Sequence, residues 1–109
     1  MKPVEVTNFQ QRVYDALMKI PKGRVTTYQE IAHHLGMRSP RAIGQALKKN
    51  PFAPEVPCHR VIRSDGSIGG YAGKTEGEKI RKKRKLLESE GVIFDKKGVL
   101  ARSESIFQF

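Results

Sequence analysis

The chain has 109 residues, 38% of them hydrophobic, and 21 Lys and Arg stand against 11 Asp and Glu, a formal net charge of +10. This composition excludes a disordered chain and predicts a single domain, residues 1–109, with one modest core. No stretch approaches the roughly 20 apolar residues of a membrane span, and no apolar signal segment opens the chain. The excess positive charge favours a polyanionic partner, above all nucleic acid, although a basic surface can also be merely a solvated one.

Residues 7–20 are predicted to form the first helix. Thr7 and Gln10 fit a capping box, and Pro21 and Gly23 end the helix. The apolar side chains recur at helical spacing and define one buried face. This face comprises Phe9, Val13, Ala16, Leu17 and Ile20.

Residues 27–49 are predicted to form a helix, a short glycine-containing turn and a second helix. The first of these helices, YQEIAHHL, follows a capping-box pattern at Thr27 and Glu30. The second has Ser39 as its N-cap and Pro40 as its first residue, both of which are favoured at those positions. This arrangement indicates a helix-turn-helix.

The second of these helices, RAIGQALKKN, carries a basic and polar solvent face. Ile43 and Leu47 are expected to be buried, and Pro51 ends the helix because it disfavours the helical conformation in the preceding residue. The solvent face comprises Arg41, Gln45, Lys48 and Lys49. Such a helix is suited to a DNA groove, although two short helices joined by a glycine turn can also serve core packing alone.

The chain becomes irregular after residue 50. Residues 51–57, PFAPEVP, contain three prolines and predict a stiff connector, because proline fixes φ and removes amide donors. The run CHRVI is suited to a short strand or a buried turn. SDGS then predicts a turn, and IGGYAG predicts a flexible loop.

Residues 75–90 are predicted to form the last helix, with a capping box at Thr75 and Glu78 and with Gly91 at its end. Its run KIRKKRK, six basic residues in seven, is typical of a solvated face but could also contact phosphates. VIFDKKGVL predicts a hairpin with its turn at DKKG. The apolar residues of the tail, which either dock on the core or fray, are Ile106, Phe107 and Phe109.

Cys58 is the only cysteine, so it cannot form an internal disulfide. This favours a reducing location, the cytoplasm or, in a eukaryote, the nucleus. A lone cysteine is most often a small buried hydrophobe, but here His59 follows it and a glycine-rich loop, which lets a ligand approach the backbone, lies just beyond. At an ordinary pKa of about 8.5 only a few per cent of a thiol is ionised at neutral pH, so His59 or Arg60 would have to assist a nucleophile.

The contact between the Cys58 thiol and the His59 imidazole depends on the local backbone. Successive residues of a regular strand point to opposite faces, so direct contact would require the chain to turn at this point. We predict a bridging water. A direct hydrogen bond between the thiol and the imidazole would contradict this prediction.

Metal binding is the competing interpretation of a cysteine beside a histidine. Zinc prefers four ligands, commonly as two spaced pairs. The chain offers Cys58, His33, His34 and His59, and the adjacent pair among them has a poor spacing for chelation. We therefore expect no metal and no cofactor.

The run PCHRV, preceded by RAIGQALKKNP and followed by GGYAG, resembles the O6-alkylguanine-DNA alkyltransferase family in its DNA-binding, active-site domain. The resemblance extends from about residue 8 to residue 94. It implies an α-rich α/β fold, a single winged helix-turn-helix domain with a small β component. It also implies that Cys58 accepts an alkyl group from guanine O6 in one irreversible turnover, after the base has flipped out of the duplex.

The resemblance assigns roles to three further residues around the thiol. His59 resembles the base that acts through water. Glu90 resembles the carboxylate that orients this histidine and stabilises its charged form, with Glu88 as the alternative. Asn50 resembles the hinge residue that ties the helix to the active-site loop.

The resemblance also assigns DNA contacts. Arg41 resembles the arginine finger that fills the gap left by the flipped base, and Tyr28 resembles the tyrosine that crowds the 3′ phosphate of the target. The other predicted DNA contacts are Gln45, Lys48, Lys49 and Ser64. Flipping a base costs a few kcal/mol, which an inserted side chain can partly offset, and phosphate contacts add affinity that does not depend on base sequence.

The predicted base pocket lies around the glycine-rich loop. Tyr71 resembles the residue that hydrogen-bonds the flipped guanine, and the carbonyls of Cys58 and Val61 are expected to accept from the exocyclic amine of the base. Gly70 and Ala72 complete this pocket. Many family members carry serine in place of Ala72, whose amide could still donate to guanine O6, so this departure concerns rate or substrate range.

The function implied is DNA repair by alkyl transfer to Cys58, and the expected partner of this monomer is double-stranded DNA containing O6-alkylguanine. Larger family members carry an extra N-terminal domain, so this chain resembles the minimal catalytic domain, and a separate partner chain could replace the missing region. The alternative is an alkyltransferase-like protein, which binds the lesion and recruits other repair factors. Such proteins have another residue, often tryptophan, in place of the reactive cysteine. A helix-turn-helix regulator is a third interpretation, but it does not explain why Asn50, Cys58, His59 and Tyr71 occur together.

Overall fold

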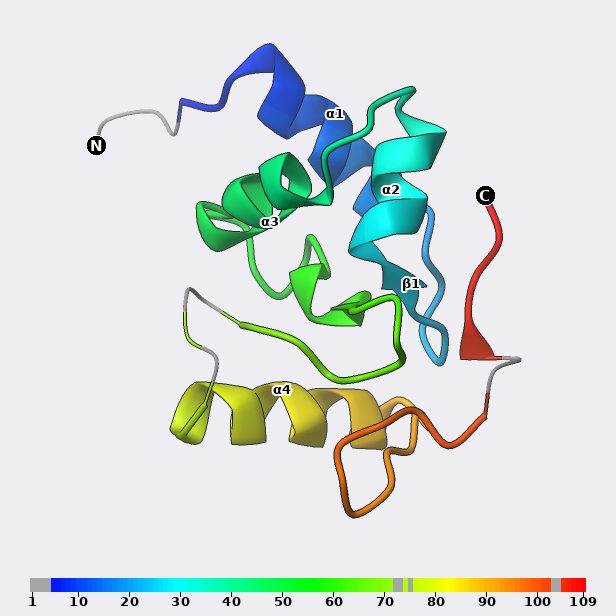
Figure 1. The fold of residues 1–109 in the computed structure, drawn as a ribbon. Coiled ribbons are helices and arrows are strands. Elements are labelled where there is room, and N and C mark those ends of the chain that lie inside the picture. Colours follow the sequence, from blue (N-terminus) through cyan, green and yellow to red (C-terminus); the bar gives the residue numbers. More distant parts are fainter. Residues whose placement is uncertain (1–4, 72–73, 75, 103–104) are drawn as a thin grey trace.

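A computed structural model describes residues 5–71, 74, 76–102 and 105–109 of the chain. The elements in order are α1 (Asn8–Leu17), β1 (Thr26–Thr27), α2 (Tyr28–His34), α3 (Pro40–Lys48), the 3-10 turn η1 (Cys58–Arg60), β2 (Val61–Ile62) and α4 (Glu78–Ser89). In Figure 1 helices α1, α2 and α3 gather on one side, α4 lies on the other, and the segment that carries η1 passes between them. The predicted helix-rich fold with a small β component is confirmed.

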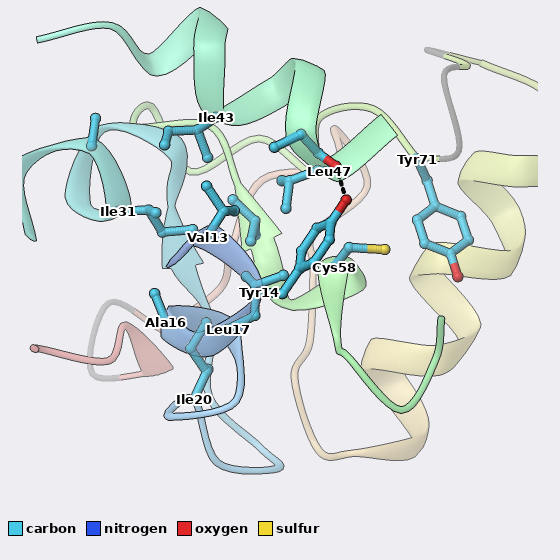
Figure 2. Close-up of a cluster of buried hydrophobic side chains, with 13 residues drawn as sticks. Val13, Tyr14, Ala16, Leu17, Ile20, Ile31, Ile43, Leu47, Cys58 and Tyr71 are labelled. Atoms are coloured by element: carbon cyan, nitrogen blue, oxygen red, sulfur yellow. Dashed lines mark hydrogen bonds between the residues drawn. The ribbon is translucent and has the colours of Figure 1, made fainter. Parts of the chain in front are cut away.

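Helix α1 begins as predicted, with a complete capping box. The Thr7 hydroxyl accepts from the Gln10 amide at 3.0 Å, and the Thr7 amide donates to the Gln10 side chain at 2.9 Å. The helix ends at Leu17, earlier than predicted, because the chain tightens into i to i+3 turns before Pro21. Tyr14, which the sequence did not single out, is buried with its hydroxyl donating to the Ala46 carbonyl at 2.9 Å (Figure 2).

Helices α2 and α3 form the predicted helix-turn-helix. The Thr27 hydroxyl accepts from the Glu30 amide at 3.0 Å, which is one half of the predicted capping box. The Ser39 hydroxyl accepts from the Ala42 amide at 3.2 Å, and Pro40 opens α3. As predicted, α3 buries Ile43 and Leu47 and exposes Arg41, Gln45, Lys48 and Lys49.

The segment after the proline-rich connector is a turn followed by a strand. Cys58–Arg60 form the 3-10 turn η1, with the Arg60 amide donating to the Pro57 carbonyl at 3.0 Å. Val61–Ile62 then pair in parallel with Thr26–Thr27. The chain therefore turns at Cys58, and the alternation of a regular strand does not govern the thiol and the imidazole.

Helix α4 begins later than predicted and ends within one residue of the prediction. Its N-cap is Gly77, with a φ of 84° and no side-chain cap. Thr75, to which the predicted capping box with Glu78 was assigned, lies outside the described residues. The helix ends at Ser89, and Glu90 is its C-cap residue. This ending matters because it places the Glu90 side chain beside η1.

The C-terminal segment packs against the rest of the chain. The hairpin turns at DKKG as predicted, with the Gly98 amide donating to the Asp95 carbonyl at 3.0 Å and a bridge between Phe94 and Leu100. Ile106 bridges in parallel to Val25, so this part of the tail docks on the core. Within the described residues, no helix combines the length and apolar character that membrane crossing requires.

Candidate active site

The Cys58 side chain sits at the edge of the main core, 8% exposed. Figure 2 shows its sulfur directed away from Tyr14, toward the side of the cluster where Tyr71 lies. Burial raises the pKa of the Cys58 thiol, and the Asn50 amide and the positive charge of Lys83 lower it by less. The thiol is therefore protonated at neutral pH, and its use as a nucleophile requires a base.

Asn50 fixes the entry to this turn from the end of α3. Its side-chain amide donates to the Val56 carbonyl at 2.9 Å, and its side-chain oxygen accepts from the Phe52 amide at 2.9 Å. These two bonds close the proline-rich connector immediately before Cys58. The geometry suits the hinge role expected of Asn50, a role that stays a prediction.

His59 and Arg60 both face one carboxylate, that of Glu90. His59 Nε2 lies 3.2 Å from each Glu90 oxygen. Arg60 donates to the same oxygens in a bidentate pair, Nε to Oε1 at 2.9 Å and Nη2 to Oε2 at 2.8 Å, and its Nη1 donates to the Ile20 carbonyl at 2.9 Å. Such planar, bidentate pairs are among the strongest hydrogen-bonded ion pairs.

The structure decides between the two glutamates that the sequence left open. The Glu90 side chain is 11% exposed and faces His59. Glu88 instead pairs along the helix surface with Arg84, at 3.1 Å and 46% exposed. Glu90 is therefore the carboxylate that the fold brings to the imidazole.

The protonation pattern around His59 follows from its partners. Burial lowers the pKa of His59, and the hydrogen bond and charge of Glu90 oppose this effect. Burial alone would raise the pKa of Glu90, but the hydrogen bonds from Arg60 and His59 outweigh it and hold the pKa below its ordinary value. At neutral pH the site thus contains a neutral imidazole beside a carboxylate.

The tautomer follows from the same contacts. Since Nε2 faces the carboxylate, we assign the proton to Nε2, which leaves Nδ1 as an acceptor. Nδ1 is buried and has no hydrogen-bond partner among the described residues. Among those residues, no hydrogen bond joins the Cys58 sulfur to either ring nitrogen of His59, and the bridging water stays a prediction.

Arg60 is one of the site residues whose place the sequence did not reveal. It was expected only as a positive neighbour of the thiol, whereas it binds the carboxylate that holds the imidazole. Its partner is 30 positions away in the sequence. No local pattern signals such a distant pair.

The predicted DNA-contacting residues converge on one cavity between α2, α3 and the loop after β2. The residues of interest that line it are Tyr28, Arg41, Gln45, Arg63, Ser64 and Gly70. Arg63 was not predicted to be there. Lys48 and Lys49 lie further along α3 as exposed side chains.

Glycine at position 69 allows this cavity wall to form. Gly69 has a φ of 73°, and a Cβ there would lie 3.3 Å from the Tyr28 hydroxyl. A larger residue would therefore strain the backbone and crowd Tyr28. Gly69 thus lets the loop lie close to Tyr28, and the approach of a ligand to this loop stays a prediction.

The predicted base-pocket residues are only partly described. Tyr71 is buried against the main core and pairs through its backbone with Lys74. The carbonyls of Val61 and Gly70 accept from Lys83 Nζ at 2.7 and 2.9 Å. Ala72 lies outside the described residues.

Lys83 corrects the expectation for the basic run of α4. This run was expected to form a solvated or phosphate-binding face, but Lys83 within it is completely buried.

The described ranges contain no group of three or more His, Cys, Asp or Glu side chains that could hold a metal ion.

Fold and site together define a helix-turn-helix domain with a buried thiol next to an imidazole–carboxylate–guanidinium group. The family model described as "6-O-methylguanine DNA methyltransferase, DNA binding domain" matches residues 8–92. The chain belongs to this family.

A curated relative agrees with this assignment. The chain is 49% identical over 89 residues to the methylated-DNA–protein-cysteine methyltransferase of Methanothermobacter thermautotrophicus, covering 82% of this chain and 47% of that protein. The chain thus spans about half the length of this curated relative.

Two solved structures resemble the fold. One is Mycobacterium tuberculosis OGT in complex with DNA, with a TM-score of 0.71 and 46% identity over 81% of this chain and 52% of that one. The other is S. pombe Atl1 in complex with damaged DNA containing O6-carboxymethylguanine, with a TM-score of 0.78 and 33% identity over 97% of this chain and 100% of that one.

Proposed function

We propose that this chain transfers the alkyl group of O6-alkylguanine in DNA to its own Cys58, in a single irreversible turnover. The observation that carries the proposal is the His59 imidazole beside Cys58, held by Glu90 with a buried, unpartnered Nδ1. Membership of a family whose relatives are named methyltransferases supports it. The proposal includes a monomer that acts inside the cell on double-stranded DNA and needs no metal or cofactor.

In the proposed reaction, His59 Nδ1 takes the thiol proton, through the predicted water. The sulfur electron pair forms a bond to the alkyl carbon as the bond between that carbon and guanine O6 breaks. The released pair stays on the guanine, which takes up one proton from water, and Cys58 becomes a thioether. The imidazolium then gives the thiol proton back to water, so no proton is gained or lost overall. Glu90 stabilises the imidazolium that forms, as a buried carboxylate beside a catalytic histidine does.

The test of this function is the intact mass of the protein after incubation with an oligonucleotide containing O6-methylguanine. We expect a gain of one methylene equivalent that saturates at one per chain, with no gain from the matching unmodified oligonucleotide. An unchanged mass after long incubation with the lesion would contradict alkyl transfer.

Lesion binding without transfer is the second candidate function. The similarity to S. pombe Atl1 over that whole chain favours it, whereas the presence of Cys58 favours transfer. The same experiment separates the two. Selective binding of the methylated oligonucleotide with no gain in mass would establish the second candidate and exclude the first.

Arg41 is proposed to act in base flipping, from the exposed face of α3 at the edge of the cavity. Arg41→Ala is expected to slow transfer from duplex DNA far more than transfer from the free O6-alkylated base, since only the duplex requires extrusion. The two single-turnover rates measure this directly.

The matched control for Arg41 is Arg81→Ala, which removes the same charge from an exposed position on α4. This variant should leave the ratio of the two rates unchanged. Equal losses with both substrates in Arg41→Ala would exclude the flipping role.

A further inference from the structure

Lys83 is a fully buried cation in an otherwise solvated basic helix. Its side chain is 0% exposed. Its Nζ donates to the carbonyls of Val61 at 2.7 Å, Ile68 at 2.5 Å and Gly70 at 2.9 Å. These three bonds use all three N–H groups of an ammonium.

The three carbonyls belong to the segment that forms the proposed base pocket. Val61 directly follows η1, Ile68 lies in the glycine-rich loop, and Gly70 lines the cavity and precedes Tyr71. One side chain of α4 therefore ties the start of this segment to its end. The distance between Val61 and Gly70, which form two walls of the proposed pocket, depends on the Lys83 side chain, because a loop rich in glycine has little rigidity of its own.

The charge state of Lys83 matters for this arrangement. Burial lowers the pKa of Lys83 to about 7, with the charge of Cys58 opposing and that of Arg63 adding to the shift. A neutral amine has only two N–H groups and would leave one of three carbonyls unpaired. The charged and titratable groups that interact with Lys83 are Cys58 and His59 of η1 and Arg63 after β2.

We propose that Lys83 is a positioning residue for alkyl transfer, whose ammonium holds the Val61 and Gly70 walls of the base pocket at the separation that places the alkylated guanine against Cys58. The inference rests on the proposed function. It assigns Lys83 no contact with the transferred group. A misplacement of a reacting group by about 1 Å can cost up to ~100-fold in rate.

Two variants of Lys83 test this inference, with an exposed neighbour as the control. Lys83→Gln removes the charge, and Lys83→Arg keeps it but places the donors in a plane that cannot serve three converging carbonyls. Lys82→Gln removes one charge from the exposed face of the same helix. Each folded variant is compared for its maximal transfer rate from methylated duplex, its affinity for unmodified duplex, and the rate at which iodoacetamide alkylates Cys58.

The expected result is a loss of about 10- to 100-fold in maximal transfer rate relative to the iodoacetamide rate for both Lys83 variants. Affinity for unmodified duplex should stay within about two-fold of the parent chain, because α3 supplies that contact. Lys82→Gln should match the parent in every rate. A purely structural role would lower thermal stability but leave the rate ratio of the folded protein unchanged, and this result would overturn the inference.

If neither Lys83 variant folds, the pH dependence of the parent chain provides the test. The maximal transfer rate from methylated duplex should fall as the pH rises through the pKa of Lys83, when the third N–H is lost. The titrations of Cys58 and His59 would change this rate in the opposite direction, because thiolate and neutral imidazole both increase with pH, so a rate that rises or stays flat would overturn the inference. If the parent transfers no methyl group at all, the proposed function fails instead, and that failure is seen before any variant is made.

Discussion

Cys58→Ala is expected to abolish methyl transfer completely while the variant still binds methylated duplex. Cys58 is the only cysteine in the chain, so no other thiol can take its place as acceptor. DNA contacts are expected from the separate surface around α3, and loss of one small buried side chain should cost only about 1 kcal/mol of stability. Intact mass measures transfer, and a gel-shift or anisotropy titration measures binding.

A residual gain of one methylene equivalent in Cys58→Ala would show that another residue is the acceptor. Loss of DNA binding together with transfer would show that the variant is misfolded, which circular dichroism detects.

In the parent chain, the rate at which iodoacetamide alkylates the free protein measures how readily the Cys58 thiol ionises. Because burial raises the pKa of the Cys58 thiol, the alkylation rate should keep increasing with pH beyond the pH range in which an ordinary thiol ionises.

Glu90→Gln is expected to lower both the stability and the transfer rate. The carboxylate accepts two hydrogen bonds from Arg60 and faces His59 Nε2. A neutral amide has no charge to pair with the Arg60 guanidinium and offers one acceptor oxygen in place of two. Breaking a buried ion pair by changing one partner costs about 3–5 kcal/mol, and the partial exposure of this pair reduces the expected loss to about 2 kcal/mol. The rate should fall by about 10²-fold, because the imidazolium that forms during transfer loses its counter-charge.

The loss of stability in Glu90→Gln should depend on pH, and it should be larger at neutral pH than in acid. Its contacts hold the pKa of Glu90 below the ordinary value, so the carboxylate stabilises the fold above the unfolded pKa of about 4.3. This contribution is lost as the pH falls through the lower, folded pKa. The stability gap between the parent and Glu90→Gln should therefore narrow in acid, which urea titrations at several pH values measure.

Glu88→Gln is the matched control for Glu90→Gln. It changes the same residue type two positions earlier, where the side chain pairs with Arg84 on the helix surface. Exposed pairs of this kind contribute at most about 1 kcal/mol. We expect transfer at the parent rate, and similar losses of rate in both variants would remove Glu90 from its proposed role.

The choice between Glu88 and Glu90 shows which part of the site the sequence could predict. Both glutamates stand near the end of a predicted helix, and the resemblance favoured Glu90 without excluding Glu88. Helix periodicity places residues on faces, but it does not decide which side chain reaches η1. Gly91, with a φ of 90°, closes the helix through local bonds, its amide donating to the Glu88 carbonyl and the Val92 amide to the Leu87 carbonyl. Only the packing of α4 against η1 decides that the Glu90 side chain, and not that of Glu88, reaches His59.

Local sequence patterns predict the helix-turn-helix, the caps at Thr7 and Ser39, the exposed basic face of α3 and the motif around Cys58. These features depend on residues a few positions apart, whose physics is local: a hydroxyl caps the amide three residues on, and apolar residues repeat with the helix. The tertiary structure alone decided that Cys58 opens a 3-10 turn, that Arg60 binds Glu90 and that Lys83 is buried. The two side-chain contacts join residues 22 and 30 positions apart, and only packing of α4 across η1 and β2 removes those charges from water and gives them their partners.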